Sequence, residues 1–207
     1  MLRLAWSPGP DLPGAMLEAI GTVAPGLVVE LVEVPGPPVS GDLRGAGWAE
    51  AAVAQAVLGA LRSGVAPTGA VAEVTAPGGG RARVRIGADD DVAVEVWAGE
   101  PLDPVTLRSY CIGAVHQALG WVWREGIAVD ATGEVLDLTI RSFGILTARD
   151  TPRVEVTIAE ADTTPVNGSA AVFAATAAAA WLADGLAPEW PTRRGRPGRP
   201  EREGMGA

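Results

Sequence analysis

The sequence predicts an α+β fold in which short mixed or antiparallel strands pack with three to four helices. Of the 207 residues, 48% are apolar and 20% are charged, which is enough apolar material for a real core. The 27 glycines and 17 prolines favour many turns over a plain helical bundle. Apolar residues also recur with two spacings along the chain, every second residue in some segments and every three to four in others.

The first 66 residues predict an N-terminal strand–helix lobe. Residues 27–34 are rich in β-branched side chains that partly alternate with glutamates, as in a strand. Residues 48–61 carry apolar side chains at helical spacing, and Gly64 closes this amphipathic helix.

Residues 67–192 predict a second domain that begins with three strands. The candidates are residues 70–75, 82–86 and 92–97, and the segments between them are rich in glycine, proline and aspartate. Such segments favour tight turns, so we expect an antiparallel meander.

The principal core helix is predicted over residues 105–123. Pro104 stands where proline is best tolerated, at a helix start, and Asp103 can cap the free backbone amides. A hairpin formed by residues 127–129 and 134–138 follows.

The C-terminal elements are a half-buried strand over residues 154–158 and an alanine-rich helix over residues 169–182. We expect Ser169 to be the N-cap of this helix. Residues 193–207 form an Arg/Pro/Gly tail, which we expect to be mobile.

Charge excludes several classes of partner. The formal net charge is −9, and the tail contributes +3, so residues 1–192 carry −12. Such a body repels nucleic acid and anionic membranes. No secretion signal is evident, and the apolar stretch over residues 170–183 is too short to span a bilayer. We expect a soluble, cytoplasmic protein.

Few residues suggest chemistry by themselves. Cys111 and His116, the only residues of their types, lie five positions apart on one predicted helix and so point about 140° away from each other. They cannot form a nucleophile–base pair there, so Cys111 is interpreted as a small buried hydrophobe and His116 as a structural histidine. One cysteine and one histidine also exclude a Cys/His metal site within this chain.

Two loops have weaker alternatives. Gly45-Ala46-Gly47 precedes a helical run, the context in which backbone amides hold a phosphate, but Glu50 replaces the third glycine and a packing role is favoured. The run Asp89-Asp90-Asp91 could be a calcium-like cluster or, more simply, a solvated turn.

Several short sequence motifs between residues 70 and 192 are similar to motifs of one family. Val92–Gly99 resembles one of the paired strands that precede the family's cofactor helix, and Arg108–Trp121 resembles that glycine- and glutamine-bearing helix. Thr147–Val156 resembles the family's Thr-Ala-x-Asp-x-Pro motif. In their order, these motifs resemble the C-terminal part of the molybdopterin-binding large subunit of the molybdenum hydroxylases. This family includes xanthine dehydrogenase, aldehyde oxidase and aerobic carbon monoxide dehydrogenase.

The resemblance implies cofactor-binding positions at Gln117, Gly113, Tyr110 and Gly168. Gln117 and the glycines match the family's motifs, whereas Tyr110 replaces a glutamine and Ile112 a glutamate. The family's catalytic glutamate, which acts as a base, is replaced by Ser169, and a serine hydroxyl is no base near neutral pH without help. The resemblance therefore implies no catalytic residue in this chain, and no metal ligand.

Three functions remain open. The favoured one is a small subunit or split fragment of a molybdenum hydroxylase that completes a larger molybdopterin-binding chain, with iron–sulfur and flavin subunits as further candidate partners. Molybdopterin would then be shared with or held by the partner and not bound by this chain alone. The second is a domain that contacts molybdopterin through Gln117, and the third is a noncatalytic structural or regulatory interaction protein with an inherited fold.

Overall fold

The computed structural model describes residues 2–6, 17–18, 21, 28–33, 41–63, 70–130, 132–137, 139 and 143–193. The chain divides into two compact units, Met1–Trp48 and Ala49–Ala207, which are described separately. The predicted boundary between residues 66 and 67 lies outside the described residues.

The first unit contains a two-stranded parallel sheet. Strand β1 (Leu2–Trp6) pairs with β2 (Val29–Glu33), with Leu4 opposite Leu31. Strand β2 confirms the predicted strand over residues 27–34. Strand β1 was not predicted, because this segment is short and a Pro-Gly sequence follows it closely.

Helix α2 (Gly41–Arg62) starts seven residues before the predicted helix. Gly45-Ala46-Gly47 therefore lies inside the helix, where backbone amides bond to carbonyls of the preceding turn. The idea that this segment offers free amides to a phosphate is wrong. In the second unit, the buried positions of α2 keep the expected helical spacing: Ala49, Ala52, Val53, Val57 and Ala60.

The second unit is built on a four-stranded mixed sheet in the order β3-β4-β5-β8. Strands β3 (Val71–Thr75), β4 (Arg81–Ile86) and β5 (Val92–Trp97) form the predicted antiparallel meander. Strand β8 (Val154–Ile158) adds to β5 in parallel, with Val94 opposite Val156. The α+β class with short mixed strands is confirmed.

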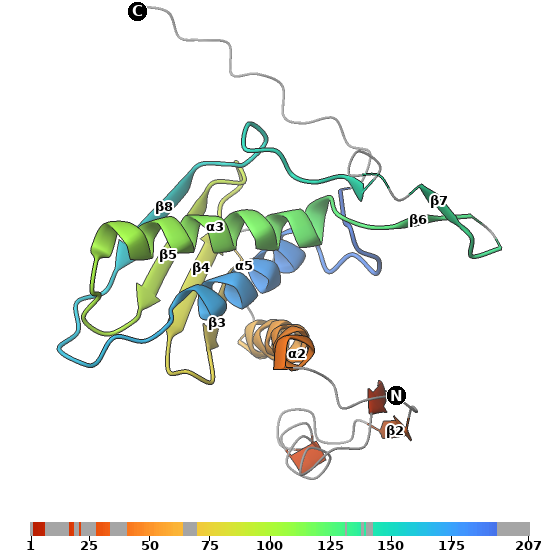
Figure 1. The fold of residues 1–207 in the computed structure, drawn as a ribbon, viewed down its shortest axis with the longest axis horizontal. Coiled ribbons are helices and arrows are strands. Elements are labelled where there is room, and N and C mark those ends of the chain that lie inside the picture. The colour runs from red at the N-terminus through yellow and green to blue at the C-terminus, as the bar shows by residue number, and fades with distance from the viewer. Residues whose placement is uncertain are drawn as a thin grey trace, which may run out of the picture. The chain divides into compact units, whose positions relative to one another are not determined.

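Alternation along β4 separates the two faces of this sheet. Ala82, Val84 and Ile86 are buried, while Arg81, Arg83 and Arg85 are exposed on the opposite face. Helices α3 (Pro104–Trp123) and α5 (Ser169–Ala183) pack on each other and lie on the same face of the sheet (Figure 1). The apolar face of the sheet is therefore buried by helices.

The N-terminus of α3 is capped as predicted. The Asp103 carboxylate accepts hydrogen bonds from the Val105 backbone amide at 2.9 Å and from the Thr106 hydroxyl at 2.6 Å. These bonds lower the pKa of Asp103, with the Thr106 bond the largest cause.

The predicted N-cap of α5 is wrong. Ser169 is the first helical residue, Gly168 occupies the cap position, and the Asn167 side chain accepts from the Ser169 amide at 2.9 Å and from its hydroxyl at 2.8 Å. An Asn-Gly-Ser sequence offers two capping side chains. Here Asn167, which lies one residue before the cap position, reaches the free donors with its side-chain oxygen.

Strands β6 (Ala128–Val129) and β7 (Val135–Asp137) form the predicted antiparallel hairpin. The turn is held by the Asp130 carboxylate, which accepts from the amides of Thr132 and Glu134.

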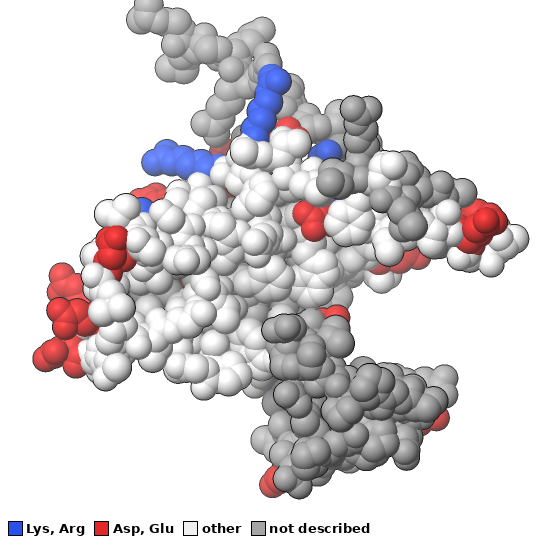
Figure 2. Space-filling view, in the orientation of Figure 1, with Lys and Arg blue, Asp and Glu red and all other residues white. Residues whose placement is uncertain are grey.

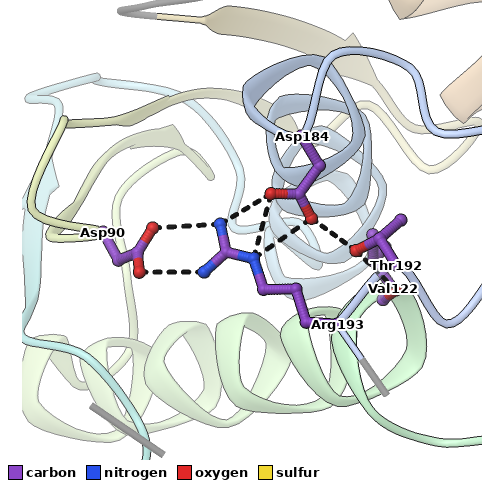
Figure 3. Close-up of polar contacts among 5 residues, drawn as sticks. All are labelled: Asp90, Val122, Asp184, Thr192 and Arg193. Atoms are coloured by element: carbon purple, nitrogen blue, oxygen red, sulfur yellow. Dashed lines mark hydrogen bonds and ion pairs between the residues drawn. The ribbon is translucent and has the colours of Figure 1, made fainter. Parts of the chain in front are cut away.

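The last described residues are bound to the body (Figure 3). The Arg193 guanidinium bridges Asp184 at 2.7 Å and Asp90 at 2.8 Å, and it lies 3.9 Å above the ring of Trp123. Arg193 is the first residue of the predicted mobile tail, and residues 194–207 lie outside the described residues. None of the described helices is long and apolar enough to cross a membrane.

Candidate interaction groove

A groove of about 530 Å³ lies between the N-terminal half of α3 and the start of α5. It brings together three of the four predicted cofactor positions, Tyr110, Gly113 and Gln117, because a spacing of three and four residues places them on one helix face. Ser169 reaches the same groove from α5. The complete lining is Val105, Thr106, Ser109, Tyr110, Gly113, Ala114, Gln117, Ser169, Ala170 and Phe173.

The hydroxyls of the two serines and the threonine in the groove are already engaged. Ser109 donates to the Val105 carbonyl at 3.0 Å, Thr106 donates to Asp103, and Ser169 donates to Asn167. None of these donors has a histidine or carboxylate placed as a catalytic base: Asp103 serves as a helix cap, with its pKa lowered. The groove therefore offers hydrogen bonds and apolar contact, and no acid–base pair.

Gly168, the fourth predicted cofactor position, is buried next to the groove and is not part of its lining. A Cβ atom on this residue would lie 2.7 Å from Cγ2 of Val96 and 3.2 Å from Cβ of Ala98. Glycine is therefore required here for close approach between the start of α5 and strand β5.

His116 and Cys111 take the structural positions expected from the sequence. His116 Nδ1 lies 2.7 Å from the Thr151 hydroxyl, which itself donates to the Thr147 carbonyl, so the ring nitrogen is the donor to Thr151. Cys111 is fully buried, and this burial raises the pKa of its thiol to about 11 despite the opposing charge of Arg108. A thiol in this state is a poor nucleophile.

The aspartate run does not form a metal site in the described part of the chain. The Asp90 carboxylate is bound to Arg193 through both oxygens. Across the described residues, no group of three or more His, Cys, Asp or Glu side chains could hold a metal ion.

The groove does not fit molybdopterin by itself. The cofactor carries a phosphate, which proteins bind with cations or free backbone amides, and none of the ten lining residues is charged. The one cationic residue of α3, Arg108, donates instead to the Val156 carbonyl on β8. The first amides of α5 are occupied by Asn167.

The surroundings of the groove are apolar and exposed. Leu102 is 94% exposed, Val105 73% and Tyr110 65%, all at the N-terminal end of α3. Helix α5 contains no charged residue and α3 only Arg108. Figure 2 shows a broad surface without acidic or basic side chains where the start of α5 and the adjoining part of α3 lie in Figure 1. Exposed apolar surface of this kind is typical of an interaction site.

A row of aromatic rings extends from the groove, and sequence reasoning missed it. Phe173 stacks on Trp121 with ring centroids 5.5 Å apart. Trp190 forms T-shaped pairs with Trp121 and Trp181, with ring centroids 4.8 and 5.6 Å apart. These residues are scattered along the sequence at positions 121, 173, 181 and 190. Their alignment depends on the packing of α3 on α5, which residue spacing does not reveal.

Comparisons with known proteins support the fold only. No family model and no curated protein matches the sequence. Similar solved structures include reconstituted CO dehydrogenase from Oligotropha carboxidovorans, with a TM-score of 0.43 and 16% identity over 52% of this chain. They also include quinoline 2-oxidoreductase from Pseudomonas putida 86, with a TM-score of 0.39 and 22% identity over 51% of this chain. The carbon monoxide-reduced Cu,Mo-CO dehydrogenase has a TM-score of 0.40 and 17% identity over 52%.

The chain spans only 15–16% of the length of these three proteins. The likeness concerns part of the fold alone. Activity, cofactor and partners do not follow from it.

Proposed function

We propose that this chain is a noncatalytic small subunit or split fragment of a molybdenum hydroxylase and completes a larger molybdopterin-binding chain. The observation that carries the proposal is the uncharged, exposed groove between α3 and α5, which lacks an acid–base pair. Such a surface suits association better than catalysis.

The exposed side chains are large enough to anchor a partner. Leu102, Val105 and Tyr110 project at the open end of α3, and complete burial of an aliphatic side chain of this size contributes roughly 1.5–3 kcal/mol. A few such anchors surrounded by polar groups are sufficient for a specific interface. The hydroxyl of Tyr110 and the amide of Gln117 provide hydrogen bonds that fix the orientation.

The class of partner is inferred from the sequence resemblance over residues 70–192. Ser169 replaces the family's catalytic glutamate, and its hydroxyl is bound to Asn167. In the proposed complex the partner chain supplies both the base and the groups that hold the cofactor phosphate. Molybdopterin, when bound there, provides the redox chemistry.

The first test is purification of the tagged chain from its native cell, with partner identification and molybdenum analysis of the same fraction. We expect a larger chain and molybdenum to copurify. Tyr110→Asp should abolish copurification, because Tyr110 lines the groove and a charge placed there would have to be desolvated. Val135→Asp is the control, since Val135 is also exposed and does not line the groove. A monomeric, metal-free chain in the native cell contradicts the proposal.

A direct contribution of Gln117 to the cofactor is tested separately. Its side chain lines the groove and is exposed, so Gln117→Ala should leave the fold intact. Loss of molybdenum from the complex at unchanged stoichiometry of chains would assign Gln117 to the cofactor. Unchanged molybdenum content and turnover would remove that role.

The alternative is a structural or regulatory interaction protein, which the groove's apolar residues and lack of an acid–base pair also favour. The same face would then bind a partner without molybdenum. Deletion of the chain separates the two functions: loss of hydroxylase activity supports the subunit, whereas altered abundance of another protein at unchanged activity supports the alternative.

A further inference from the structure

We propose that the free edge of β8 binds an extended, positively charged segment of a partner chain as a fifth strand of the sheet. This site is separate from the groove between α3 and α5. It would add a second contact surface to the proposed subunit and does not depend on the first.

The backbone of β8 has one unpaired edge in the described part of the chain. β8 is the last strand of the sheet and pairs with β5 alone. The Val92 amide donates to the Arg153 carbonyl, and the Ala159 amide donates to the Val96 carbonyl, each at 2.9 Å. Since alternate residues of a parallel strand bond to the same neighbour, Val154, Val156 and Ile158 direct their amides and carbonyls to the open side.

A hollow of about 810 Å³ lies beside this edge. It is lined by residues 156–162, by Pro101 and Pro104, and by the charged side chains of Glu100, Arg108, Glu160 and Asp162. Three acidic residues thus face one basic residue. Figure 2 shows acidic side chains gathered at the end of the molecule where the loops after β5 and β8 lie in Figure 1.

Arg108 covers the middle of the open edge of β8. It extends from α3 and donates to the Val156 carbonyl, one of the acceptors on the open side. A cationic side chain at a strand edge discourages indiscriminate pairing. An incoming strand therefore has to displace Arg108 while its own cations approach the three acidic groups.

These features define the chemistry of the occupant. The backbone must be extended, because the pairing groups follow the spacing of β8. Basic side chains suit it because Glu100, Glu160 and Asp162 line the hollow, and alternation with apolar residues directs them to one face of the added strand. An acidic or helical segment fits neither requirement.

The test is a binding titration of the full-length chain with a capped octapeptide of alternating arginine and valine. We expect binding at least about tenfold tighter than that of the matched glutamate–valine peptide, since opposite charge attracts only the former. N-methylation of alternate peptide bonds preserves charge but removes pairing donors, and it should weaken binding by about tenfold. The double variant Glu160→Gln/Asp162→Asn should also weaken binding.

Arg108→Ala provides a test with the opposite sign. The variant frees the Val156 carbonyl and removes a repelling cation, so the arginine–valine peptide should bind several-fold more tightly. Tyr110→Asp, which alters the groove on the opposite side of α3 from Arg108, should leave peptide binding unchanged. Failure of the proposed function and failure of this site are therefore distinguishable. Circular dichroism confirms that each variant is folded.

Three outcomes would overturn the proposal. Equal binding of the N-methylated peptide would reduce the effect to charge attraction without strand pairing. Weaker binding by Arg108→Ala would mean that Arg108 contacts the peptide and does not block the edge. Binding only after replacement of Arg194, Arg196, Arg199 and Arg202 by serine would identify the chain's own tail as the occupant.

Discussion

The two ends of α3 differ in what covers them. At the C-terminal end, Val122 and Trp123 are buried, and their carbonyls accept hydrogen bonds from the amides of Thr192 at 2.7 Å and Arg193 at 2.9 Å. At the N-terminal end, Leu102 and Val105 are exposed and the Asp103 cap holds the first turn.

This difference shows where the fold is complete. The last carbonyls of a helix lack partners within the helix, and here residues 192–193 supply them from the chain itself. Nothing in the described part of the chain does the same for the apolar side chains at the opposite end. The open end of α3 is therefore the place at which the proposed partner would bury the most exposed apolar surface.

The largest expected effect is at the closed end. Arg193→Ala leaves the Asp184 carboxylate, whose side chain is only 11% exposed, without its cation and should lower the free energy of unfolding by about 3 kcal/mol. Urea denaturation measures the loss. Arg85→Ala, an exposed arginine on the open face of the sheet, should change it by less than about 0.5 kcal/mol. Equal effects of the two variants would show that the Arg193 bridge does not hold this end.

The same substitution at two glycines beside the groove should have opposite effects on stability. Gly168→Ala places a Cβ against Val96 and Ala98 and should destabilise the protein by about 1–3 kcal/mol. Gly113→Ala adds a Cβ in open space on α3 and should stabilise it by up to about 1 kcal/mol. Thermal unfolding of both variants tests these opposite signs. Destabilisation by Gly113→Ala would mean that another group already fills the space beside Gly113.

Local patterns predicted most of the second unit from the sequence. The meander, α3 with its Asp103 cap, the hairpin and α5 follow from apolar period and turn residues, because these signals act over a few positions. The parallel addition of β8 to β5 could not be read in this way. It joins segments about 60 residues apart, and nothing within either segment specifies its direction.

The candidate site was predicted only in part for the same reason. Tyr110, Gly113 and Gln117 share a helix face, so their grouping follows from spacing, and Ser169 joins them only through helix packing. Arg193 looked like one basic residue in a polar tail. Its bridge to Asp90 and Asp184 depends on two segments that precede it by 103 and 9 positions.

The alkylation rate of the Cys111 thiol tests how far the exposed end of α3 extends along the helix. At pH 8 its raised pKa should slow alkylation about a hundredfold relative to the unfolded chain, before any steric protection. The stability that the buried neutral thiol contributes is present in full below pH 9.0 and is lost as the pH rises toward about 11. Alkylation by iodoacetamide, followed by mass spectrometry, measures the rate. A rate equal to that of the unfolded chain would show that the open end extends past Cys111.

The smallest expected effect concerns the Asp103 cap. The pKa of Asp103 is lowered from 3.8, chiefly by the Thr106 hydrogen bond, so the charged cap stabilises the fold above that value and loses this contribution as the pH falls through the lowered pKa. Asp103→Ala should therefore reduce Tm at pH 7 and have a shrinking effect in acid. Asp103→Asn, which keeps a capping oxygen, should retain most of the neutral-pH stability. Because Arg193 and Thr192 hold the other end independently, amide hydrogen exchange should rise in residues 105–110 and stay unchanged in residues 114–123. Faster exchange along the whole helix would show that α3 opens as one unit and that its two ends are not independent.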